Sequence, residues 1–185
     1  MKRILAILLA LLLLSGCGGR GSELDRAMAL RTKLLSQGVT FHASITADYG
    51  DMVHTFSLFC EADSQGNVMF TVTEPQSIRD ITGIIRSGTG KLTFDDQAIA
   101  FDLLADGQLS PISAPWIFLK ALHSGYMTSC GKEGEYLRLA VDDSYAEDAL
   151  HLDIWLGSGD LPVRAEILWQ GSRVLSMDVG NFIFV

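Results

Sequence analysis

The segment Phe41-His-Ala-Ser-Ile-Thr-Ala47 decides the fold, because apolar and polar side chains alternate along it with the period of a β-strand. A tight-turn pair, Gly50-Asp51, follows it. Folding the chain at that pair gathers apolar residues on one face and hydroxyl groups on the other. The expected apolar pairs are Ile45 with Phe56, Ala43 with Leu58 and Phe41 with Cys60, and the expected hydroxyl pairs are Thr46 with Thr55 and Ser44 with Ser57.

A second turn continues this pattern toward the C-terminus. The loop Ser64-Gln65-Gly66 places a glycine where a three-residue hairpin needs a left-handed backbone. Pro75 then ends the third strand. The expected pairs are Ala62 with Val68, Cys60 with Phe70 and Leu58 with Val72. The sequence therefore predicts a meander of three strands with one shared inner face.

The rest of the chain extends this β pattern and adds two helices. The apolar spacing favours one helix over residues 23–37, with Ser22 as its cap, and one from Ser113 to Gly125. Further strands are expected over residues 78–85, 91–94, 99–104, 136–141, 150–156 and 173–184. A four-residue loop over 157–160 is expected to pair Ile154 with Val163, Leu152 with Ala165, Asp153 with Arg164 and His151 with Glu166.

These elements indicate a mainly β (α+β) fold. About ten antiparallel strands without βαβ alternation predict one large curved sheet, or half-open β-barrel, rather than a parallel sheet. Its apolar face has to be covered, and the two helices are the available cover. The expected lining of an apolar cavity under this helical lid is Phe41, Ile45, Phe56, Leu58, Phe70, Trp116, Phe118 and Leu122. A packed core without free space is the alternative interpretation of the same residues.

The N-terminus reads as an export signal. Lys2 and Arg3 precede an apolar run over residues 4–14, which is too short to span a bilayer. The following Leu14-Ser-Gly-Cys17 resembles the lipobox of bacterial lipoproteins. The resemblance implies a signal peptide over 1–16, a lipidated Cys17 with a flexible tether over 17–21, and a domain over 22–185. An ordinary signal peptide with an incidental cysteine is the alternative.

The order of the elements resembles the LolA/LolB-like fold of bacterial lipoprotein carriers and receptors. The matching features are the helix before Phe41 to Ala47, the break at Pro75, the helix after Ser110-Pro111, and the ending Leu161-Pro-Val-Arg-Ala-Glu166. That family has an incomplete barrel with a helical lid over an apolar cavity. Because this chain carries a lipobox, it is also similar to lipidated spore-germination lipoproteins of the GerS type, which act by binding a partner protein.

Motifs for catalysis are not evident. The segment Gly88-Thr-Gly-Lys91 is better explained as a turn than as a phosphate loop. The four histidines are scattered, and Asp95, Asp96, Asp102 and Asp106 fall in expected turns, so we expect no metal, no cofactor and no catalytic residue. A disulfide between Cys60 and Cys130 is open, with a buried free thiol at Cys60 the favoured alternative. The formal charge of −8 argues against binding of nucleic acid and of anionic headgroups.

Three functions follow as hypotheses. The first is a non-enzymatic lipoprotein, anchored on the extracytoplasmic face of the cell membrane, that binds a partner protein in envelope or spore peptidoglycan processing. The second is a carrier or receptor for an acyl chain or lipoprotein, with the apolar cavity as its site. The third, an enzyme such as a hydrolase, ranks last because convergent polar groups are missing.

Overall fold

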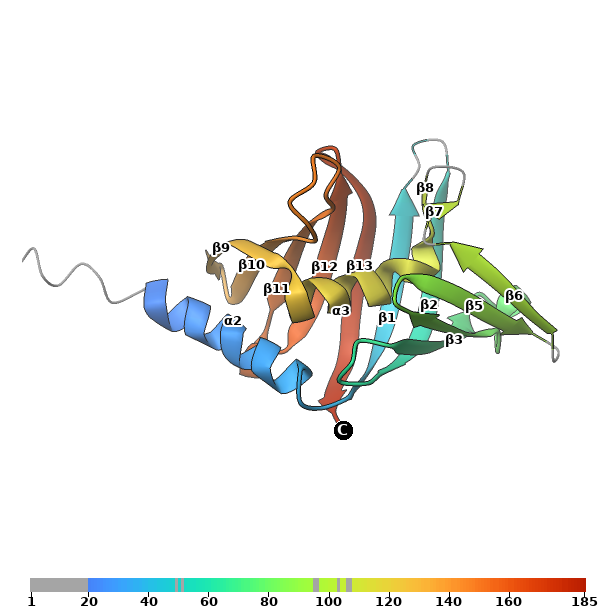
Figure 1. Cartoon of the computed structure of the whole chain (residues 1–185), viewed down its shortest axis with the longest axis horizontal. Coiled ribbons are helices and arrows are strands. Elements are labelled where there is room, and N and C mark those ends of the chain that lie inside the picture. The colour runs from blue at the N-terminus through green and yellow to red at the C-terminus, as the bar shows by residue number, and fades with distance from the viewer. Residues whose placement is uncertain (1–19, 49, 51, 95–96, 103, 106–107) are drawn as a thin grey trace, which may run out of the picture.

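The computed structural model describes residues 20–185 except 49, 51, 95–96, 103 and 106–107, and the side chains of 20–22 and 94–108 are not described. The signal peptide, Cys17, Asp95, Asp96 and Asp106 therefore lie outside the described residues. Labels follow Figure 1. Helix α2 (Arg20–Leu34) begins inside the stretch expected as a tether and before Ser22, so Ser22 is not its cap.

One curved antiparallel sheet of eleven strands dominates the described part of the chain, and the mainly β, half-open architecture is confirmed (Figure 1). Its order is β6-β5-β4-β3-β2-β1-β13-β12-β11-β10-β9, with a separate pair β7-β8. The strand bounds are β1 Val39–Asp48, β2 Val53–Ala62, β3 Val68–Glu74, β4 Thr82–Arg86, β5 Thr89–Phe94, β6 Gln97–Asp102, β7 Leu104–Ala105, β8 Gln108–Leu109, β9 Tyr126–Glu133, β10 Tyr136–Asp142, β11 His151–Leu156, β12 Pro162–Trp169 and β13 Ser172–Phe184.

The predicted meander is confirmed residue by residue. Ile45 faces Phe56 and Ser44 faces Ser57 across β1 and β2, as the alternation requires. Cys60 faces Phe70 across β2 and β3. In the loop between them, Gly66 has φ of 80°, the left-handed backbone that the three-residue turn needs.

Two expectations about the strands were wrong. In the hairpin of β11 and β12, Ile154 faces Ala165 and Asp153 faces Glu166, so the predicted pairing is displaced by two residues. The displacement arises because the short helix η3 (Ser158–Asp160) and a register shift after Trp155 lengthen the connection. The predicted strand over 78–85 is also shorter, since Gln76–Ile78 form a turn of 3₁₀ helix (η1) and β4 starts only at Thr82.

The two helices lie on the concave side of the sheet. Helix α3 (Ala114–Ser124) follows the 3₁₀ turn η2 (Pro111–Ser113), ends at Gly125 as predicted, and runs across the concave face of the sheet (Figure 1). Helix α2 packs beside β9 and buries Ala27, Leu30 and Leu34. The inner face of the sheet and the buried sides of both helices form one apolar cluster.

Candidate functional site

The inner face of the sheet and the facing helix α3 together hold most of the residues predicted to line an apolar cavity. Seven of the eight belong to the buried cluster, whereas Phe56 is only half-buried and is not part of it. The Phe41 ring meets Phe118 of α3 edge-on at 6.0 Å and stacks on Phe182 of β13 at 5.5 Å. The lid helix therefore lies directly on the face that it was expected to cover. The residues in the cluster are Phe41, Ile45, Leu58, Phe70, Trp116, Phe118 and Leu122.

Helix α3 is apolar except for Lys120, His123 and Ser124. Eight of its eleven residues are buried, and the partly exposed Lys120 lies over the Trp116 ring at 5.4 Å and pairs with Asp143 at 3.5 Å. The helix stops where Gly125 lets the backbone approach closely. A Cβ at Gly125 would lie 2.4 Å from Val141 Cγ1 and 2.6 Å from the Ala121 carbonyl oxygen. The end of the lid is thus fixed against β10.

Arg31 of α2 holds the C-terminal end of this lid. Its guanidinium donates hydrogen bonds to the main-chain oxygens of Leu122 at 2.7 Å, Gly125 at 2.8 Å and Ala121 at 3.3 Å. A cation at the end of a helix also stabilises the helix dipole. Partial burial lowers the pKa of Arg31 from its usual value, but an arginine stays protonated under physiological conditions. These hydrogen bonds could not be predicted from the sequence, because they join residues about ninety positions apart.

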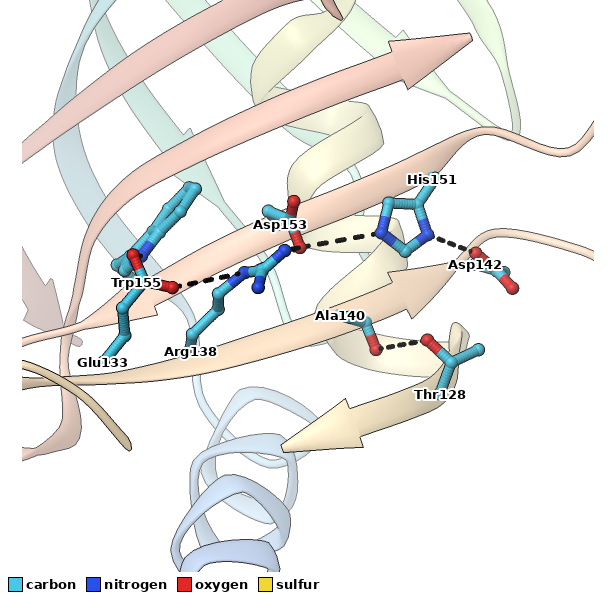
Figure 2. A network of polar contacts seen from close by, with 8 residues as sticks. All are labelled: Thr128, Glu133, Arg138, Ala140, Asp142, His151, Asp153 and Trp155. Atoms are coloured by element: carbon cyan, nitrogen blue, oxygen red, sulfur yellow. Dashed lines mark hydrogen bonds and ion pairs between the residues drawn. The ribbon is translucent and has the colours of Figure 1, made fainter. Parts of the chain in front are cut away.

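A polar network covers the opposite, outer face of strands β10 and β11 (Figure 2). Arg138 lies 2.7 Å from Asp153 and 3.6 Å from Glu133, and the hydrogen bond to Asp153 raises the pKa of Arg138. His151 bridges two carboxylates, Asp142 at 2.7 Å and Asp153 at 3.6 Å. Figure 2 shows these side chains as one chain of contacts along the strands. Sequence reasoning missed this network because its members come from separate strands.

Trp155 sits at the centre of this outer surface. Its indole nitrogen donates a hydrogen bond to Glu133 at 3.2 Å, and the guanidinium groups of Arg138 and Arg164 lie 5.9 and 5.2 Å from its ring. A pocket of about 360 Å³ opens beside it, lined also by Tyr136, Val163 and Asp178. The outer face of β10 to β13 therefore offers an aromatic side chain set among paired charges.

The two cysteines that the structure describes lie on different strands of the sheet. Cys60 is buried on the inner face, where burial raises its pKa well above the usual value, and Cys130 lies on the edge strand β9. Both thiols are free, so the open question of a disulfide is answered against the bond. Within the described ranges, no group of three or more His, Cys, Asp or Glu side chains is placed to hold a metal ion. Gly88 occupies the turn between β4 and β5, as predicted, but Thr89 to Lys91 already belong to β5, so the predicted turn over 88–91 is too long.

Comparison with known proteins gives only distant structural similarity. No family model and no curated protein matches the chain. Similar solved structures include an uncharacterised conserved protein from Thermus thermophilus (12% identity, 87% of this chain and 86% of that chain, TM-score 0.49). They also include a LolA superfamily protein from Nitrosomonas europaea (11% identity, 84% and 92%, TM-score 0.44) and the lipoprotein LppX from Mycobacterium tuberculosis (11% identity, 87% and 93%, TM-score 0.41).

These similarities concern the fold, and they do not extend to a ligand, a partner or the role of any residue. A LolA superfamily protein is among the similar structures, as the order of elements led us to expect. The narrower likeness to spore-germination lipoproteins receives no support from them. At 12% identity or less, no ligand and no residue role passes from these proteins to this chain. Among the described residues, no helix combines the length and the hydrophobicity that crossing a bilayer requires.

Proposed function

We propose that this protein is a non-enzymatic binding protein, anchored through lipidated Cys17 on the extracytoplasmic face of the cell membrane, that holds an acyl chain or lipoprotein between its sheet and helix α3. The observation that carries the proposal is the largely apolar lid helix, eight of whose eleven residues are buried. Helix α3 fills the concave face with side chains such as Trp116, Phe118 and Leu122, all of them buried. An acyl chain can replace such contacts, because burial of apolar surface is not directional. Displacement of α3 would therefore expose a ready-made site.

The clasp at the end of α3 provides the test. Arg31→Ala removes the three hydrogen bonds that tie the lid to α2, so it should speed the uptake of a fluorescent fatty acid by the lipidated protein in detergent. Arg26→Ala is the matched control, because Arg26 is also an arginine of α2 but its side chain pairs with Asp160 rather than with the lid. Uptake by neither variant nor the native chain would refute the carrier function, as would equal acceleration by both substitutions.

A second candidate function is the docking of an extracytoplasmic partner protein, in envelope or spore peptidoglycan processing. The outer surface around Trp155 favours it, because tryptophan and arginine dominate the binding energy of protein interfaces. Trp155→Ala should then release a partner that co-purifies with the native chain from envelope membranes. Trp169→Ala is the control, because Trp169 is an exposed tryptophan on the neighbouring strand β12. Retention of every co-purifying protein by the Trp155 variant would exclude this surface as the docking site.

A further inference from the structure

Helix α2 carries an exposed apolar edge that the fold leaves uncovered. Leu24 is 45% exposed and Met28 is 43% exposed, and Leu35, one residue beyond the helix, is 54% exposed. A spacing of four residues places Leu24 and Met28 on one side of the helix, and the hydrogen bond from the Leu35 amide to the Arg31 carbonyl oxygen continues the helical turn, so Leu35, seven residues after Met28, falls on the same side. This side is distinct from the buried side of α2, which presents Ala27, Leu30 and Leu34 to the core. Large apolar side chains aligned on an exposed helix edge indicate a contact surface.

The edge continues into a groove between α2 and the edge strand β9. The groove has a volume of about 410 Å³ and is lined by Leu24, Met127, Thr128, Ser129 and Cys130. The groove and the helix edge together make a surface of small, apolar and hydroxyl-bearing groups. No carboxylate is among the groove residues, although the whole chain has a formal charge of −8.

The short distance along the chain between α2 and Cys17 indicates that a membrane covers this surface. Only two residues, Gly18 and Gly19, separate Cys17 from the first residue of the helix at Arg20. Three peptide steps span at most about 10 Å, even when fully extended. A lipidated Cys17 would therefore hold the first turn of α2 within about 10 Å of the headgroup layer, and Leu24 lies only about 6 Å further along the helix.

The charge of α2 fits the same occupant. The helix contains four basic residues, Arg20, Arg26, Arg31 and Lys33, against the two acidic residues Glu23 and Asp25. It is a basic element in an acidic chain. Two of these cations, Arg26 and Arg31, are already bound to Asp160 and to the end of α3, so charge adds only a modest attraction to anionic lipid and apolar contact has to carry the interaction.

The helix is also held rigidly enough to orient the domain. Arg26 is bound to Asp160 of η3, and Arg31 is bound to the end of α3, so both halves of α2 are tied to the half-barrel. A contact made by the exposed edge would consequently set the angle of the whole domain on the bilayer. It would turn the groove beside β9 toward the lipid.

We propose that the edge formed by Leu24 and Met28 of α2 and by the adjoining Leu35 rests in the outer headgroup layer of the membrane and orients the half-barrel on it. This inference rests on the proposed anchor at Cys17 and deepens it. A lipid chain entering the protein would meet the groove between α2 and β9 first.

Site-directed fluorescence tests the contact on the full lipidated chain. In a Cys130→Ser background, the buried Cys60 and the acylated Cys17 do not react, so a polarity-sensitive label attaches only at Met28→Cys. The matched control is Ala29→Cys, an exposed neighbour about 100° around the helix. The vesicles contain phosphatidylcholine with phosphatidylglycerol and a lipid that bears a spin label near the top of its acyl chain.

The spin-labelled lipid should quench the label at position 28 about threefold or more strongly than the label at position 29, because only the first position faces the interface. Equal quenching of protein that floats with the vesicles would overturn the membrane contact and leave the anchor intact. Failure to float would overturn both. A third outcome would also overturn the proposal. If the emission of the label at position 28 shifts to the blue as the protein concentration rises in detergent, and the label is not quenched in vesicles, the edge contacts a second copy of the chain instead.

Discussion

The Arg138–Asp153 pair allows a quantitative prediction for the outer network. Asp153 is only 7% exposed, and Arg138 donates a 3.0 Å hydrogen bond to it. In Arg138→Met, the nearest remaining partner of Asp153 is His151, at 3.6 Å. Loss of a hydrogen bond to a buried charge costs about 1.5–3 kcal/mol, reduced here because the Arg138 side chain is 41% exposed. We expect the free energy of unfolding to fall by about 1–2.5 kcal/mol, which lowers Tm by about 2–10 °C for a domain of this size.

Arg164→Met is the matched control for that substitution. Both arginines lie over the Trp155 ring, so both variants lose a cation–π contact. Glu166, however, keeps Arg173 at 3.0 Å when Arg164 is removed. The control should therefore cost less than about 1 kcal/mol. Thermal unfolding of the lipidated proteins in detergent, followed by far-ultraviolet circular dichroism, measures the difference. Equal losses in the two variants would refute the reasoning, and Arg138→Met combined with Asp153→Leu should recover most of the stability.

Three more outcomes can be checked on the same preparation. Gly125→Ala should lower the free energy of unfolding by about 1–3 kcal/mol, because its Cβ has no room, whereas Gly131→Ala, which meets nothing within 4 Å, should leave Tm nearly unchanged. Burial lowers the pKa of His123 in the folded state, so the unfolded chain binds its proton more readily and stability should fall as pH drops below about 6.5. His123→Gln should flatten the pH dependence of the free energy of unfolding, measured by denaturant titration at several pH values. The same pH dependence in this variant and in the native chain would contradict the role of His123. Maleimide should modify Cys130 in the native protein but Cys60 only after unfolding, as mass spectrometry of the intact chain would show.

The sequence predicts the fold well wherever one face of a strand is buried and the other is exposed. Strict alternation over Phe41–Ala47 leaves a single register, and the structure has it. Strand β9 was missed because Tyr126–Glu133 lies at the sheet edge and alternates weakly. The pairing of β11 with β12 was misplaced because a bulge and an extra turn are invisible to a pattern of apolar residues.

The candidate site could be predicted only in its apolar part. Phe41 and Phe118 are recognisable as inward-facing residues of a strand and a helix, and they do meet. The clasp of Arg31 on α3 and the bridge of His151 between Asp142 and Asp153 depend on tertiary placement. Charged residues scattered along a sequence carry no signal of which strands will bring them together. Whether the inner face ever opens around a ligand stays a prediction.

The pairing of β1 with β13 determines which part of the sheet can form first and which must form last. The first and last strands lie side by side at the middle of the sheet, so the two halves share a seam made from opposite ends of the sequence. Contacts between residues so far apart in sequence form late in folding. During synthesis the N-terminal meander can form early, but the edge of β1 stays unpaired until β13, the thirteen-residue strand at the end of the sequence, has been made. A chaperone that covers the exposed edge of β1 would protect the chain from aggregation during this interval. A truncation that removes β13 would leave that edge unpaired permanently and would favour aggregation.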